Sequence, residues 1–122
     1  MLQNQKNINS IESNTNEYLF IKADRKFYKI MLADILYIVG LKDYVVIHTQ
    51  QQKLITAMNL KTIHQKIDLD TFLRVSKSYI VNTNPITSFD NHTVYINENN
   101  IPMGEVYRND FIAKYSDGIL NL

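Results

Sequence analysis

Short runs of apolar and β-branched residues, separated by polar turn residues, dominate the chain from residue 18 onward. Runs rich in Val, Ile, Tyr and Phe and bounded by Gly, Pro, Asn or Asp are typical of β-strands. The pattern predicts strands at 18–23, 27–32, 35–39, 44–49, 53–58, 73–75, 79–81, 86–89, 93–96 and 101–103. Because most of these runs follow one another across short turns, we expect antiparallel pairs.

The spacing of apolar residues becomes helical in two places. One face of a short helix after the N-capping residue Asn59 is predicted by three apolar residues, Leu60, Ile63 and Ile67. A second helix, from Gly104 to Gly118, is predicted by a stripe of apolar and aromatic residues, Val106, Tyr107, Phe111 and Tyr115. The fold class is therefore mainly β, with small antiparallel sheets, one short mid-chain helix and a C-terminal helix.

Length and composition indicate a single domain between two terminal tails. The 122 residues are 45% hydrophobic and 20% charged, which is ordinary for one globular core. We expect a flexible tail or linker at 1–17, a domain at 18–118 and a C-terminal tail at 119–122. No apolar run approaches the roughly 18 residues of a membrane-spanning helix, and no secretory signal begins the chain. These features predict a cytoplasmic protein without a membrane partner.

The residue types do not form a constellation for catalysis. The chain contains no Cys, which excludes disulfides, thiol catalysis and Cys-ligated zinc. The histidines lie on a strand, a helix and a turn without the spacing of metal ligands, at His48, His64 and His92. The three Gly residues are isolated, so no glycine-rich phosphate loop is present. We expect no enzyme activity, no metal and no cofactor.

Three basic residues stand at or beside separate chain reversals. Lys42 lies between two predicted strands, Lys77 lies in a polar Ser-Lys-Ser segment between two apolar runs, and Arg108 lies near the start of the last helix. Loops on a stiff scaffold often carry recognition residues, although three unrelated surface charges would give the same pattern. The net charge of +1 is low for a nucleic-acid binder unless the basic residues gather on one face.

Three segments, in the same order, resemble blocks of the LytTR family of bacterial transcription-factor DNA-binding domains. They are DILYIVGLKDYV at 34–45, FLRVSKSYIVN at 72–82 and IPMGEVYR at 101–108. The second block is the most specific of the three, and the resemblance extends over about residues 18–115. Two positions depart from the family pattern, which often has His where Ser76 stands and Ser-Arg where Gly104 and Glu105 stand.

The resemblance implies an elongated arrangement of small sheets whose loops enter successive major grooves of duplex DNA. It assigns DNA contacts to three loop regions: Lys42, Asp43 and Tyr44 in the first, Ser76, Lys77 and Ser78 in the second, and Glu105 and Arg108 in the third. Basic side chains can bond the guanine edge, and hydroxyl groups can fix the register on phosphates.

The function implied by the resemblance is sequence-specific binding of double-stranded DNA, by a bacterial transcriptional regulator or a response-regulator output domain of a two-component system. The implied partners, besides DNA, are a second copy on repeated half-sites and a receiver domain or upstream sensor. The near-neutral charge and the acidic Glu105 keep a second hypothesis open. In that hypothesis, the chain is a protein-interaction or sensory module that has lost DNA affinity on the same scaffold.

Overall fold

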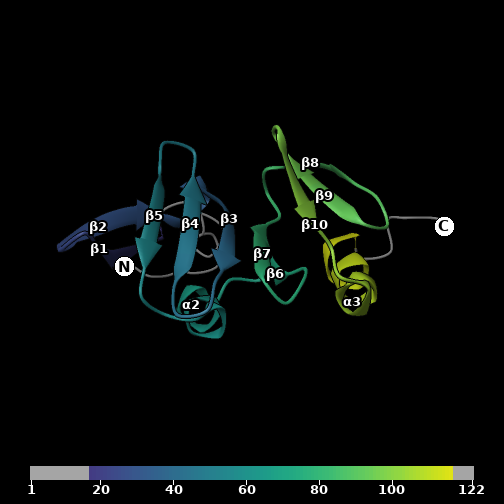
Figure 1. The fold of residues 1–122 in the computed structure, drawn as a ribbon. Coiled ribbons are helices and arrows are strands. Elements are labelled where there is room, and N and C mark those ends of the chain that lie inside the picture. Colours follow the sequence, from purple (N-terminus) through teal and green to yellow (C-terminus); the bar gives the residue numbers. More distant parts are fainter. Residues whose placement is uncertain (1–16, 117–122) are drawn as a thin grey trace, which may run out of the picture.

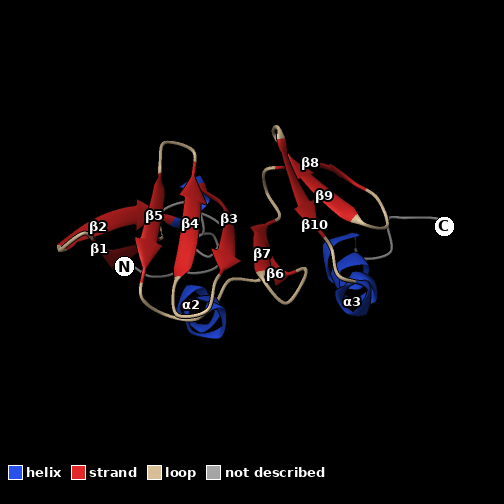
Figure 2. Ribbon diagram, viewed as in Figure 1, coloured by secondary structure: helices blue, strands red, loops and turns tan. Residues whose placement is uncertain are grey.

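A computed structural model describes residues 17–116 of the chain. Within these residues, three antiparallel sheets and two α-helices form an elongated row (Figures 1 and 2). One end of the row is a hairpin of β1 (Tyr18–Ala23) and β2 (Lys26–Met31), and a short 3-10 helix, η1 (Leu32–Asp34), follows it. The mainly β fold class and the antiparallel pairing predicted from the pattern are both confirmed.

The middle of the row is a five-stranded sheet with the order β5-β4-β3-β7-β6. Its strands are β3 (Ile35–Gly40), β4 (Val45–Thr49), β5 (Lys53–Thr56), β6 (Phe72–Arg74) and β7 (Tyr79–Asn82). The far end is a three-stranded sheet of β8 (Ile86–Phe89), β9 (Thr93–Ile96) and β10 (Asn99–Pro102). The pairing of β7 with β3 is the long-range step that places the second half of the chain beside the first.

The two helices each cover one part of this row (Figure 1). Helix α2 (Leu60–Ile67) begins at Asn59, whose side chain accepts a hydrogen bond of 2.8 Å from the Thr62 backbone N–H. This is the predicted N-cap, and the predicted apolar face of α2 is buried. Helix α3 (Glu105–Ser116) lies beside the three-stranded sheet and buries Phe111 against it, where Phe111 packs edge-on to Phe89.

Two hydrophobic clusters fill the molecule, and they share the central sheet. The first cluster lies between the hairpin, α2 and one face of the sheet, and the second lies between the other face, the three-stranded sheet and α3. Because side chains alternate along a strand, Ile80 of β7 belongs to the first cluster and Val81 to the second. Both side chains are fully buried.

Some predictions about the elements are wrong. Val106 is 88% exposed and does not belong to a buried stripe, because five helical residues place it about 140° from Phe111 around α3. The strand predicted to begin at residue 101 begins at Asn99, because the chain already turns at Asn97, which has a positive φ of 55°. Asn99 of β10 can therefore pair with Ile96 of β9. The strand predicted to reach residue 58 ends at Thr56. The end of α3 predicted at Gly118, and both predicted tails except Glu17, lie outside the described residues.

Candidate nucleic-acid interface

The first predicted loop, residues 41–44, is a tight connection between β3 and β4. The Leu41 N–H donates to the Tyr44 carbonyl at 2.8 Å, which closes the loop. At its base, Gly40 pairs with Val45 across the two strands. Lys42, Asp43 and Tyr44 are all exposed, so the three residues assigned to this loop are accessible to a ligand.

The second predicted loop, residues 75–78, connects β6 to β7. Its shape is fixed by hydrogen bonds within the loop and from the preceding Arg74 side chain. The Arg74 guanidinium donates from Nε to the Ser76 carbonyl at 2.9 Å and from Nη2 to the Lys77 carbonyl at 2.7 Å. The Ser78 N–H donates to Ser76 Oγ at 3.1 Å, so this hydroxyl caps the turn. Lys77 and Ser78 are exposed, and Ser76 is half-buried.

The third loop leads from β10 into the first turn of α3. Gly104 lies so close to the second loop that a Cβ atom on it would come within 3.6 Å of Ser76 Cα. Glu105 and Val106 are exposed, and Arg108 is half-buried. Between the second and third loops lies an open groove of about 490 Å³, whose lining includes Lys77, Pro102, Val106 and Tyr107.

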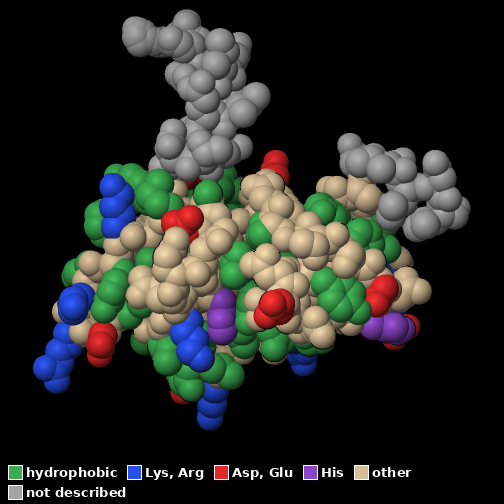
Figure 3. Space-filling model, turned by 90° about the horizontal axis from the view of Figure 1, so that it is seen from above, with side chains coloured by type: hydrophobic (Ala, Val, Ile, Leu, Met, Phe, Trp, Pro, Cys, Tyr) green, Lys and Arg blue, Asp and Glu red, His purple; other side chains and the backbone are tan. Residues whose placement is uncertain are grey.

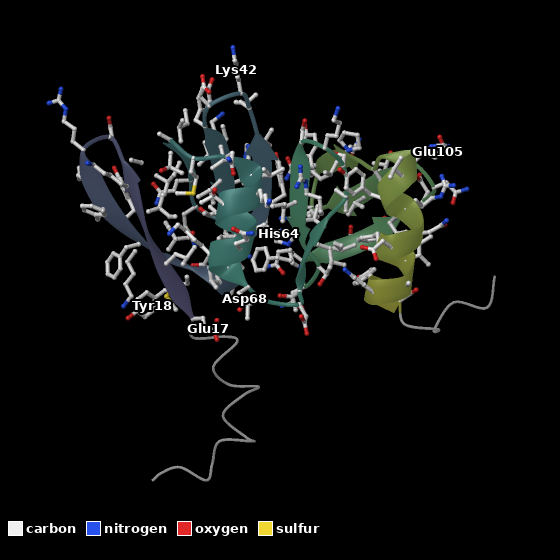
Figure 4. All side chains as sticks on the ribbon, turned by 90° about the horizontal axis from the view of Figure 1, so that it is seen from below. Glu17, Tyr18, Lys42, His64, Asp68 and Glu105 are labelled. Atoms are coloured by element: carbon white, nitrogen blue, oxygen red, sulfur yellow. The ribbon has the colours of Figure 1, made fainter. Side chains whose placement is uncertain are left out.

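Main-chain hydrogen bonds join the three loops at their bases. The Gly40 N–H donates to the Ser78 carbonyl at 2.7 Å, which ties the first loop to the second. The Gly104 N–H donates to the Val75 carbonyl at 2.7 Å, which ties the third loop to the second. Figure 4 accordingly shows Lys42 and Glu105 along one edge of the molecule, opposite the edge where Glu17 and Asp68 lie. The structure therefore brings the three predicted regions together in one row.

The charges on this edge are unpaired but mixed in sign. Among residues 17–116, the one ion pair within 4.0 Å joins Lys114 to Asp110, at 3.2 Å. The basic groups Lys42, Lys77 and Arg108 thus have no carboxylate partner in the described part of the chain. Asp43 and Glu105 reduce the sum for these five side chains to +1, from three positive and two negative groups. Seen from the opposite side, Lys and Arg side chains project along this edge and at the hairpin end (Figure 3).

Two residues of this edge were missed by reasoning from the sequence. Val106 was placed in the core because its apolar side chain fits a helical stripe, yet it is exposed beside the groove. Arg74 was not assigned a role, yet its guanidinium holds the two carbonyls of the second loop. Arg74 precedes the Ser-Lys-Ser reversal by two residues, but no local pattern specifies that its side chain folds back onto the loop. Nothing in the local pattern around Val106 indicates its exposure.

The described part of the chain shows neither a metal site nor a membrane span. No group of three or more His, Asp or Glu side chains within residues 17–116 is placed to hold a metal ion. No helix among these residues is both long enough and apolar enough to cross a membrane.

The described part of the chain is an elongated β module that presents three tied loops on one edge. The sequence matches the model of the LytTr DNA-binding domain over residues 25–116, so the chain belongs to this family. It is a family of DNA-binding domains and not of enzymes. The family membership predicted from the three sequence blocks is therefore confirmed.

A solved structure has the same fold. It is the LytTr DNA-binding domain of a protein described as a methyl-accepting/DNA response regulator from Bacillus cereus. The TM-score is 0.70 at 14% sequence identity, and the match covers 81% of this chain and 96% of that one. No curated protein sequence matches the chain significantly. The structural likeness supports the fold, whereas the family match supports DNA binding.

Proposed function

We propose that the chain binds a specific double-stranded DNA sequence by inserting its three loops into successive major grooves, as a cytoplasmic bacterial transcription regulator or response-regulator output domain. The observation that carries the proposal is the pair of main-chain ties from Gly40 to Ser78 and from Gly104 to Val75. These hydrogen bonds keep the three loops in a row with fixed spacing, and loops that enter successive major grooves need such fixed spacing. Their geometry does not depend on the loop side chains.

Each loop offers groups that suit a DNA groove. Lys77 can bond guanine O6 and N7 in the major groove, and Asp43 and Glu105 can accept from the amino group of cytosine. The exposed side chain of Val106 can contact the methyl group of thymine. The Ser76 hydroxyl oxygen already accepts from the Ser78 N–H, but its own proton remains free to bond a phosphate.

The mixed charges predict moderate affinity for random DNA. Each neutralised phosphate contributes about −0.9 to the slope of log K against log salt. Because the five charged side chains of the loops sum to +1, we expect them to neutralise few phosphates and the slope to be shallow. Two copies on half-sites about 34–36 Å apart, one helical turn, would raise the affinity without new contacts. A receiver domain or an upstream sensor joined to such a module would control when the two copies meet.

The proposal is tested by selecting bound duplexes from a random DNA pool and measuring their affinities by fluorescence anisotropy. We expect Lys77→Ala to weaken binding to the selected site by about 5-fold to 150-fold, as the loss of a base contact worth about 1–3 kcal/mol requires. Binding to a scrambled duplex should change less, and the melting temperature should stay the same because Lys77 is exposed.

The matched control is Lys66→Ala, a change in an exposed lysine of α2 that precedes Asp68 on the opposite edge. It should leave both affinities unchanged. Failure to select any sequence, or equal losses in the two variants, would argue against specific reading by the second loop.

A second candidate function is a protein-interaction or sensory module on the same scaffold. The exposed Val106 and Glu105 favour it, because an apolar and an acidic side chain beside the groove suit a protein surface as well as DNA. The two candidates separate at low salt. Absence of binding to any duplex at about 50 mM salt, where phosphate contacts are strong, would favour the second.

A further inference from the structure

The tip of the β1–β2 hairpin is a basic feature that the three-loop site does not include. Its two turn residues, Asp24 and Arg25, have positive φ angles of 57° and 69°. Two-residue hairpin turns of this kind favour Gly at the second position, because other residues are strained there. An exposed Arg at such a position is a local outlier, and outliers of this kind point to a functional constraint.

Two lysines flank the turn and give the tip a positive sum. Lys22 Nζ lies 5.8 Å from the centre of the Phe27 ring, and Lys26 Nζ lies 5.8 Å from the centre of the Tyr28 ring. Both lysines and Arg25 are exposed, and none has a carboxylate within 4.0 Å in the part of the chain that the structure describes. With Asp24, the tip carries three positive charges and one negative charge.

The tip lies at the same edge as the three loops. The Thr56 hydroxyl donates to the Lys22 carbonyl at 2.7 Å, which ties the tip end of β1 to the end of β5. Thr56 in turn pairs with Val45, and Val45 pairs with Gly40 at the base of the first loop. In Figure 4, the hairpin begins at Tyr18 on one edge and turns at the edge where Lys42 lies.

We propose that this hairpin tip is a fourth DNA contact, in which Lys22, Arg25 and Lys26 bind phosphates beside the segment that the three loops read. The inference rests on the proposed function. Two strand steps of about 4.8 Å separate β3 from β5. The hairpin is a separate sheet that lies beyond β5 and is tied to it by the Thr56–Lys22 bond, so the tip lies roughly 15 Å from β3. At 3.4 Å per base pair, the tip reaches about four to five base pairs beyond the first loop. Because phosphate contacts carry no sequence information, the tip adds affinity without adding specificity.

The experiment compares Arg25→Gln/Lys26→Gln with the unchanged protein by fluorescence anisotropy over a range of salt concentrations. The probes are a selected duplex with eight extra base pairs at each end, a scrambled duplex of equal length, and the selected duplex without its ends. We expect a roughly 5-fold to 50-fold loss at 0.1 M salt on both long duplexes, and a slope of log K against log salt that is less negative by about 1.8. The loss should disappear on the duplex without ends.

Two further variants separate a DNA contact from other effects. Arg25→Gly removes the cation and supplies a residue that adopts the positive φ without strain. It should therefore weaken DNA binding while the melting temperature stays the same or rises. Lys53→Gln/Lys66→Gln removes the same number of charges elsewhere, since Lys53 pairs with His48 at the other end of β5 and Lys66 precedes Asp68 on the opposite edge. This control pair should leave affinity and slope unchanged.

Each remaining outcome overturns the inference. Unchanged affinity and slope in the tip variants would refute the fourth contact alone, provided that Lys77→Ala still loses binding to the selected site. Equal losses of affinity in the tip pair and the control pair would show that only the net charge of the protein matters, and would also refute the fourth contact. Absence of duplex binding by the unchanged protein would refute both the tip contact and the proposed function.

Discussion

At the scale of single residues, His48 stacks on Tyr37 of the neighbouring strand, with ring centres 4.2 Å apart and planes 12° apart. Lys42 and Lys77 lie on loops, as their places at chain reversals predicted, and both are exposed. Val106 shows the limit of such predictions, because an apolar side chain is compatible with either the core or the surface of a helix.

The His48 stack predicts a pH dependence of stability. Burial, and secondly the charge of Lys53, lower the pKa of His48 in the folded chain below its ordinary value of 6.5. Between pH 6.5 and that lower value, the unfolded chain binds more protons, so stability rises with pH and is lost as the pH falls. We expect the free energy of unfolding in urea to be smaller at pH 5.5 than at pH 7.5. In His48→Gln this difference should shrink, and an equal difference in both proteins would refute the role of His48.

At the scale of elements, local patterns located most strands and both helices, because alternation and helical spacing are properties of short segments. The errors lie at element ends. Asn99 and Asn100 resemble turn residues by composition, yet Asn97 takes the left-handed position and releases them into β10. The second loop was recognised as a polar reversal, but its internal support by Arg74 depends on side-chain geometry that no local pattern specifies.

The support of the second loop by Arg74 gives a prediction about positioning. In Arg74→Met, the carbonyls of Ser76 and Lys77 lose their donors, so Lys77 should be held less firmly. Binding to the selected duplex should then fall about 5-fold to 30-fold, as roughly 1–2 kcal/mol of lost hydrogen bonding implies. The dependence of log K on log salt should not change, because Arg74 supports the loop without touching a phosphate. A slope less negative by about 0.9 would instead identify Arg74 as a phosphate contact.

At the scale of the whole molecule, the sheet order could not be predicted from periodicity. The pairing of β3 with β7 joins residues about forty positions apart, and strand patterns alone do not choose between such partners. The elongated outline came from the family resemblance, which thus supplied what the pattern lacked. The same pairing places two hydrophobic clusters on opposite faces of one sheet, with Ile80 and Val81 as neighbours that face different clusters.

The shared sheet predicts that the whole described domain unfolds as one unit. Ile96 is fully buried in the second cluster, so Ile96→Ala should reduce the free energy of unfolding by about 2–5 kcal/mol. Hydrogen exchange should then accelerate by the same factor for Ile47 in the first cluster and Val94 in the second. Faster exchange confined to β8, β9 and α3 would show that the two ends of the domain melt independently.

The ties between the loops have a consequence for how such a domain can acquire a new target. The donors are the backbone N–H groups of Gly40 and Gly104, which every residue except proline possesses, and the acceptors are the carbonyls of Ser78 and Val75, which every residue possesses. Side chains at 42–44, 77, 105 and 106 can therefore be exchanged without loosening the frame that spaces them. A library randomised at these positions alone should retain folded members in large number and change which operator they prefer.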